Sequence, residues 1–289
     1  MNVSASEIIE RLAGKTQEPE GYRGEDGNIY CLRCGKPLTM LISKPELALF
    51  KRVPILCDCG KKREEEKAQR EWEQIIDTNR KRCFQESRSA DKDRLISATF
   101  DKDDNPSCEA SRIARGYSKL FQEAMCGGDS LRKGTGLLLY GPPGTGKSFY
   151  AACIANDVIS RGNTALYTTF GSIAARMQES YEARPEIMAE LEKPSLLILD
   201  DLGAERDTEY MQEIVFEVIN LRYRRSKPMI VTTNLTATEL MNTEAVGKNR
   251  IYDRLIECCE PVEVSGPSRR REQFKDRHKK AIEAMKGAK

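Results

Sequence analysis

A glycine-rich segment at residues 141–148 has the spacing of a phosphate-binding loop, and it connects an apolar run to a stretch with helical periodicity. Glycine lets the backbone curl so that its N–H groups point at phosphate oxygens, and a following helix start adds partial positive charge. Lys147 is expected to reach the β- and γ-phosphates, and Ser148 to hold Mg²⁺. The expected nucleotide-binding residues are Gly141, Pro142, Pro143, Gly144, Thr145, Gly146, Lys147 and Ser148.

Two later apolar runs end in polar side chains that suit the same chemistry. The run at 196–199 leads into Asp200 and Asp201, and the run at 228–233 leads into Asn234. Parallel sheets bind ligands at the carboxyl ends of their strands, where these side chains would meet a nucleotide. We expect Asp200 to hold Mg²⁺. Asp201 would orient or deprotonate the attacking water, and Asn234 would align that water beside the γ-phosphate.

A second group of residues that could do chemistry lies near the amino terminus, at Cys31, Cys34, Cys57 and Cys59. Two thiolate pairs separated in this way predict a tetrahedral four-cysteine Zn²⁺ site. The second pair is one residue shorter than the usual C-x-x-C, which leaves Cys83 open as a substitute ligand. Free thiols are the alternative.

The elements that position these residues follow from hydrophobic patterning. Five apolar segments alternate with helical patterns and predict a doubly wound α/β domain with a parallel sheet; they are 136–141, 164–170, 195–201, 228–234 and 261–266. Residues 61–89 lack Gly and Pro and predict one long exposed helix. We therefore expect an amino-terminal zinc-binding module with this linker helix at 1–90, and an ATPase domain at 95–289.

Composition and charge limit the partners and the cellular location that the sequence predicts. The 289 residues carry a formal net charge of only +2, so total charge alone predicts neither a nucleic-acid coat nor a membrane surface. The chain has no export signal and no apolar run long enough to span a membrane, which predicts a cytoplasmic protein without a membrane partner. In the basic segment 266–289, contact with DNA phosphates and a solvated face both stay open.

Taken together, the loop GPPGTGKS, the strand LLILDDLG and the terminal TTN resemble the Walker A, Walker B and sensor 1 motifs of AAA+ ATPases. The Asp201 form is similar to DnaC- and DnaI-type replicative helicase loaders and to IstB-type transposition helpers. The resemblance covers about residues 95–272. It implies a five-stranded sheet, a very small lid and ATP-dependent self-assembly.

The same resemblance assigns two further sites. The segment RIYDRL resembles an arginine-finger helix, with Arg254 as the finger and Arg250 next in line. The segment GPSRR resembles the sensor 2 region, with Arg270 at the arginine position and Arg269 where the family has an aromatic residue. Sensor 2 therefore stays open among Arg269, Arg270 and Arg271.

The leading hypothesis from the sequence is an ATP-dependent loader of a hexameric replicative helicase onto single-stranded DNA. By resemblance to DnaI-type loaders, the zinc module would bind the helicase. A zinc ribbon that binds DNA is the rival interpretation of this module. An aspartate at position 201, where most of the superfamily has glutamate, predicts slow hydrolysis that a partner stimulates. The alternatives are an IstB-type transposition helper and an ATP-switched adaptor with little hydrolysis.

Overall fold

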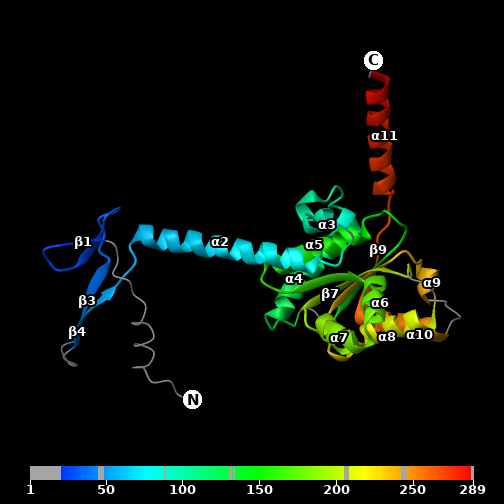
Figure 1. Cartoon of the computed structure of the whole chain (residues 1–289), viewed down its shortest axis with the longest axis horizontal. Helices are drawn as coiled ribbons and strands as arrows, with labels where there is room; N and C mark the ends of the chain where they lie inside the picture. The colour runs from blue at the N-terminus through cyan, green and yellow to red at the C-terminus, as the bar shows by residue number, and fades with distance from the viewer. Residues whose placement is uncertain are drawn as a thin grey trace. The chain divides into compact units, whose positions relative to one another are not determined.

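The computed structural model describes residues 21–44, 49–87, 89–129, 132, 134–204, 208–241 and 246–287. By its internal contacts the chain divides into two compact units, Met1–Ile75 and Ile76–Lys289. The division falls inside α2 (Asp58–Cys83), a helix of 26 residues that occupies most of the region where one long helix is expected (Figure 1). The functional boundaries at residues 90 and 95 stay a prediction.

The first unit contains two small antiparallel hairpins. One pairs β1 (Gly21–Arg23) with β2 (Ile29–Cys31), and the other pairs β3 (Thr39–Lys44) with β4 (Leu49–Pro54). Among the described residues its buried apolar cluster consists of Cys31, Leu38 and Cys57. An apolar cluster of this size contributes little folding free energy by itself.

The second unit is built on a five-stranded sheet in which every pairing is parallel, with the strand order β6-β7-β8-β5-β9. The strands are β5 (Gly136–Tyr140), β6 (Ala165–Thr169), β7 (Leu196–Leu202), β8 (Met229–Thr233) and β9 (Cys259–Glu263). The α/β fold with a five-stranded parallel sheet is confirmed. Four strands lie where expected, whereas β9 begins earlier than the predicted segment 261–266 because Cys259 and Glu260 already pair with β5.

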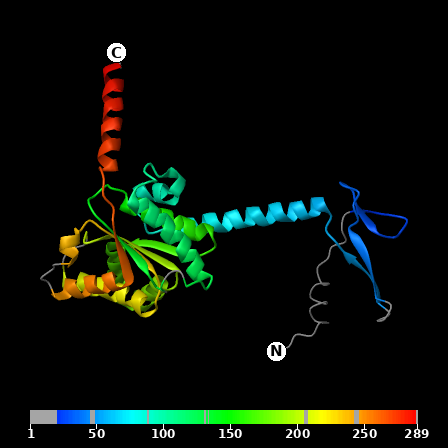
Figure 2. The same cartoon turned by 180° about the vertical axis from the view of Figure 1, so that it is seen from behind.

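Helices cover both faces of this sheet (Figures 1 and 2). On one face lie α3 (Ser89–Ile96), α4 (Glu109–Met125) and α5 (Lys147–Ser160), and a short 3-10 turn, η2 (Phe100–Lys102), precedes α4. The other face carries α6 (Phe170–Glu179), η3 (Tyr181–Ala183), α7 (Arg184–Glu192), α8 (Glu209–Arg224), α9 (Ala237–Met241) and α10 (Val246–Cys258). After β9 comes α11 (Arg269–Gly287).

The central strands carry near-continuous apolar runs, such as 137–139 and 196–199, because they are buried on both sides. In β5, Leu137 and Leu139 pack with α4 and α5, while Leu138 packs with the α6–α8 layer. Side chains of a strand alternate between faces, so a strand covered on both sides needs a continuous apolar run. This burial rigidly positions the carboxyl ends of β5, β7 and β8, where the polar motif residues lie.

Candidate nucleotide site and cysteine centre

The loop at residues 141–148 joins β5 to α5 and carries its glycines where the backbone demands them. Gly144 has φ +86°, and a Cβ there would lie 2.3 Å from Ser268 Oγ. Gly146 has φ +113° and precedes the first residue of α5. Only glycine combines positive φ with such a close neighbour at low cost. The loop thus has the left-handed turns that aim N–H groups into its concave side.

Lys147 is held inside this loop. Its Nζ donates hydrogen bonds to the carbonyl oxygens of Gly141, at 2.8 Å, and of Pro142, at 2.7 Å. Burial lowers the pKa of its ammonium from the ordinary value, although the charges of Asp201 and Asp200 act in the opposite direction. The ammonium is therefore sequestered by two neutral carbonyls that anionic oxygens can replace.

Asp200 is buried at the end of β7, where two hydroxyls donate to the same oxygen. Ser148 Oγ lies 2.9 Å and Thr232 Oγ1 lies 2.5 Å from Asp200 Oδ1. Ser148 lies in the first turn of α5 and Thr232 belongs to β8, so three elements meet at this carboxylate. A carboxylate and a hydroxyl at this separation are oxygen ligands of the kind that Mg²⁺ prefers.

Asp201 points elsewhere because the strand is irregular at this point. Its φ is +60°, and the register between β7 and β8 shifts between Leu199 and Leu202. Its N–H donates to Thr232 Oγ1 at 3.0 Å, which stabilises this backbone conformation. A bulge adds an unpaired residue to one strand and changes the direction in which the side chains around it point. Asp200 is therefore buried and Asp201 exposed within the same cleft.

Two adjoining cavities surround these residues. One of about 390 Å³ contains Ser148, Asp200 and Asp201 in its lining. The other, of about 300 Å³, is lined by Gly144, Gly146, Lys147, Ser148, Asp201, Asn234, Arg269 and Arg270, among others. Asn234 and Arg270 thus lie with the loop and the carboxylates as expected. Arg271 lines neither cavity, so of the three sensor 2 candidates Arg269 and Arg270 face the cleft.

Arg254 is not part of this cleft. It lies on α10, with its guanidinium 4.0 Å from the ring centroid of Tyr223 and Nη1 3.0 Å from Glu257 Oε2. Arg250, on the same helix, is exposed. The fold therefore brings together every expected nucleotide-site residue except the finger candidate.

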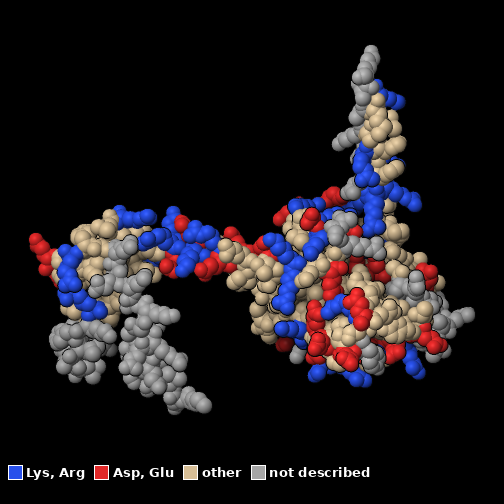
Figure 3. Space-filling view, viewed as in Figure 1, with Lys and Arg blue, Asp and Glu red and all other residues tan. Residues whose placement is uncertain are grey.

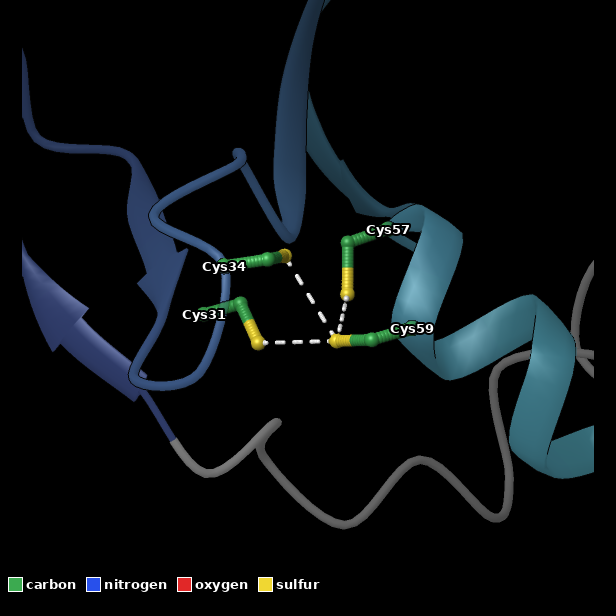
Figure 4. A group of neighbouring side chains, drawn as sticks. All are labelled: Cys31, Cys34, Cys57 and Cys59. Atoms are coloured by element: carbon green, nitrogen blue, oxygen red, sulfur yellow. Dashed lines mark hydrogen bonds between the residues drawn. The ribbon is translucent and has the colours of Figure 1, made fainter.

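The four cysteines of the first unit converge (Figure 4). Their Sγ atoms all lie within 4.8 Å of one another, and Cys59 Sγ lies 3.4 Å from Cys31 Sγ, 3.5 Å from Cys34 Sγ and 3.2 Å from Cys57 Sγ. In a tetrahedral Zn²⁺ site with Zn–S bonds of about 2.3 Å, sulfur atoms are roughly 3.8 Å apart. The cluster fits a zinc ion after small side-chain adjustments.

Local backbone geometry prepares the cluster for a metal. The chain turns tightly after Cys31, whose carbonyl accepts the Gly35 N–H at 2.9 Å. The N–H groups of Cys34 and Arg33 lower the pKa of the Cys31 thiol to about 6 by bonding to its sulfur. Cys59 joins the cluster from the first turn of α2, and this explains why a spacing shorter than C-x-x-C works.

Cys83, which the sequence left open as a ligand, lies in a different environment. It is 1% exposed and belongs to the apolar core beside α4 and α5 in the second unit. Burial raises the pKa of its thiol, which disfavours the thiolate that metal binding requires. Its place in the structure is that of a packing residue.

Three residues at or beside the nucleotide cleft were not predicted from the sequence. Thr232 lies in the expected strand that ends in TTN. Its hydroxyl, within an otherwise apolar run, is the sequence feature that could have indicated its role. Asp103 and Asp104 belong to the polar break before α4 and contact Arg269. Their role depends on a contact across more than 160 positions of sequence, which no local pattern encodes.

A five-stranded parallel sheet in this order, with a glycine loop, a buried strand ending in two carboxylates and a polar strand end at one edge, defines a P-loop nucleotide-binding protein of the AAA+ kind. Its family can be stated as well. The chain belongs to the IstB-like ATP binding protein family, which matches residues 114–277.

The relatives of this chain include both insertion sequence ATP-binding proteins and replicative helicase loaders. The chain is 40% identical over 119 residues to a protein of Sinorhizobium fredii named as an insertion sequence ATP-binding protein, covering 39% of each chain. It is 28% identical over 119 residues to the replicative helicase loader DnaC of Escherichia coli, covering 40% of this chain and 47% of that one. The matches thus span less than half of the length of either relative.

A solved structure supports the fold. The crystal structure of DnaI matches with a TM-score of 0.50 at 23% identity, and the match covers 61% of this chain and 92% of that chain. At this identity the likeness shows the fold alone. Within the described residues, no helix is both long and apolar enough to cross a membrane.

Proposed function

We propose that this chain is an ATP-hydrolysing loader of a hexameric replicative DNA helicase. The observation that carries the proposal is the pairing of an IstB-like ATP-binding unit with a separate four-cysteine module. The relatives include DnaC, and sequence resemblance to DnaI-type loaders links an amino-terminal zinc module to the grip on the helicase. IstB-type helpers generally lack such a module.

In the proposed reaction the loop N–H groups and Lys147 bind the phosphates of ATP, and Ser148 and Asp200 hold Mg²⁺. The magnesium ion would neutralise charge on the β- and γ-phosphate oxygens. Asp201 orients the attacking water, and Asn234 aligns it from the neighbouring strand end. Arg270 lines both cavities of the cleft and would contact the phosphates. The short Asp201 side chain makes basal hydrolysis slow until a partner stimulates it.

Assembly would complete the site. Arg254 lies outside the cleft of its own subunit, and its ion pair with Glu257 keeps it at the surface of α10. We propose that it acts in a neighbouring subunit, where it stabilises charge developing on the transferred phosphoryl group. Single-stranded DNA is the proposed nucleic-acid ligand. Exposed basic side chains on α11, among them Lys275, Arg277 and Lys279, offer phosphate contacts (Figure 3).

The direct test is complex formation with candidate hexameric helicases, measured by co-elution with Mg²⁺ and ATP. We expect one helicase to bind the full chain. This binding should be lost in Cys31→Ser and retained in Cys126→Ser, a control at an exposed cysteine. Binding unaffected by loss of the cysteine cluster would contradict the role of the module. A complex that forms while no ATP is hydrolysed would favour the ATP-switched adaptor.

The insertion-sequence relative at 40% identity supports a second candidate, an IstB-type transposition helper. Such a helper binds duplex DNA and a transposase. Titration of the full chain with single-stranded and duplex DNA of equal length, in the presence of ATP, separates the two functions. Clear preference for the duplex, together with failure to bind any replicative helicase, would establish this alternative over the loader.

A further inference from the structure

Arg269 lies where the nucleotide cleft extends past the phosphate-binding loop. The cavity around the loop continues beside the first turn of α5, where its lining includes Lys102, Asp104, Phe149 and Arg269. None of these four residues lines the neighbouring cavity that holds Asp200, the expected magnesium ligand. The cleft therefore has a metal side at Asp200, and the cavity around the loop extends away from that side toward Phe149.

The guanidinium of Arg269 is clamped by acidic and aromatic neighbours. Its Nη2 lies 2.6 Å from Asp104 Oδ1, 3.4 Å from Asp103 Oδ1 and 3.3 Å from the Tyr150 hydroxyl. Its central carbon lies 5.5 Å from the ring centroid of Phe149 and 5.6 Å from that of Tyr150. Its side chain nevertheless keeps 22% of its surface exposed, toward the cleft that it lines.

Asp103, one of the two acidic partners of Arg269, is fixed in the protein interior. It is buried, and its second oxygen accepts a hydrogen bond from Ser111 at 2.5 Å. The clamp is also attached to the loop, because the Arg269 N–H donates to the Gly144 carbonyl at 3.0 Å. A Cβ at Gly146 would lie 3.2 Å from Arg269 Nη1. The position of the guanidinium is thus determined by the same loop that would hold the phosphates.

We infer that Arg269 binds the base of the nucleotide by stacking its planar guanidinium on the purine ring, with Asp103 and Asp104 as positioning residues. The inference rests on the proposed ATP-binding function. Phosphates held in the loop leave the base on the side of Phe149, since the neighbouring cavity on the other side holds Asp200, the expected magnesium ligand. A planar guanidinium stacks on aromatic faces much as an aromatic side chain does.

The stacking role predicts how each part of the nucleotide responds to mutation. In Arg269→Ala the affinity for ATP and for ADP should fall equally, by about tenfold, because both carry the base. Inorganic tripolyphosphate, which has no base, should bind as tightly as to the wild type. Arg269→Phe should restore ATP binding because it keeps a flat surface. Arg271→Ala is the matched control: this exposed neighbour lines neither cavity, so its binding should not change.

Isothermal titration of the full chain with ATP, ADP and tripolyphosphate tests whether Arg269 binds the base. Unchanged ATP affinity in Arg269→Ala, an equal loss of tripolyphosphate binding, or an Arg269→Phe variant as weak as Arg269→Ala would each overturn the inference. Tripolyphosphate binding also reports that each variant is folded at the loop. If the wild type binds neither ATP nor tripolyphosphate, the proposed nucleotide site itself fails, and this outcome is distinct from failure of Arg269 alone.

Discussion

At the scale of single residues, the structure of the cleft distinguishes two aspartates whose roles the sequence motif does not separate. Two consecutive aspartates look equivalent in sequence. The bulge in β7 buries Asp200 against Ser148 and Thr232 and leaves Asp201 exposed in the cleft. Metal binding and water activation can then be assigned to different carboxylates, and each assignment can be tested by itself.

Lys147→Ala should lose ATP affinity by roughly a hundredfold or more, because a charge-assisted contact to the phosphates disappears. The measurement is equilibrium binding of ATP with Mg²⁺. Lys119→Ala, an exposed lysine on α4 that lines neither nucleotide cavity, serves as control and should bind normally. ATP affinity that survives in Lys147→Ala would exclude this loop as the phosphate site.

Asp201→Asn should keep ATP binding and lose hydrolysis by about 10²- to 10⁴-fold, because the amide cannot accept a proton from water. Turnover and binding are measured on the same preparation. Asp253→Asn, at an exposed carboxylate on α10, should hydrolyse ATP at the wild-type rate. Normal turnover in Asp201→Asn would show that another group activates the water.

At the scale of elements, the amino-terminal module shows why a metal is expected to be structural. Among its described residues, two of the three side chains in the buried apolar cluster belong to the four-cysteine group. Folding free energy in such modules comes largely from metal binding. The second unit stands in contrast, with a continuous core on both faces of its sheet.

Purified full-length chain should therefore contain one Zn²⁺. Cys31→Ser should release the metal and raise the exposure of the first unit to protease, while ATP binding by the second unit stays unchanged. Metal analysis and ATP titration are the two readouts. Cys83→Ala should retain zinc, since Cys83 is buried in the other unit. A preparation made without chelator that contains no zinc would rule the site out.

At the scale of the whole molecule, the location of Arg254 outside its own cleft raises the question of sharing between subunits. Arg254→Ala should bind ATP but lose hydrolysis and ATP-dependent assembly. Mixing it with Asp201→Asn protein should restore part of the activity, because some interfaces then join an intact carboxylate to an intact arginine. An arginine acting within its own subunit could not be rescued in this way.

Arg225→Ala provides the matched control for this experiment. Arg225 pairs with Glu192 at 3.0 Å, as Arg254 does with Glu257, but it lies at the end of α8. Its variant should hydrolyse ATP and assemble normally. If Arg254→Ala also assembles and hydrolyses normally, Arg254 is only a surface ion-pair residue, and Arg250 becomes the next candidate for the finger.

Much of the nucleotide site could be predicted because its residues are sequence neighbours. The loop from Gly141 to Ser148 is one continuous segment. Buried parallel strands can be recognised in the sequence as apolar runs such as 196–199. Strand ends in one parallel sheet meet at one edge, so Asp200 and Asn234 could be placed beside the loop without coordinates. The four-cysteine cluster was likewise predictable from spacing.

Only the tertiary structure decided the remaining points, because they depend on contacts between segments distant in sequence. The choice of Arg269 and Arg270 over Arg271 depends on how the chain after β9 crosses the loop at Gly144. The exclusion of Cys83 depends on which core the end of α2 enters. The different surroundings of Asp200 and Asp201 depend on the register between β7 and β8, since a local pattern specifies a strand but not the neighbour against which it bulges.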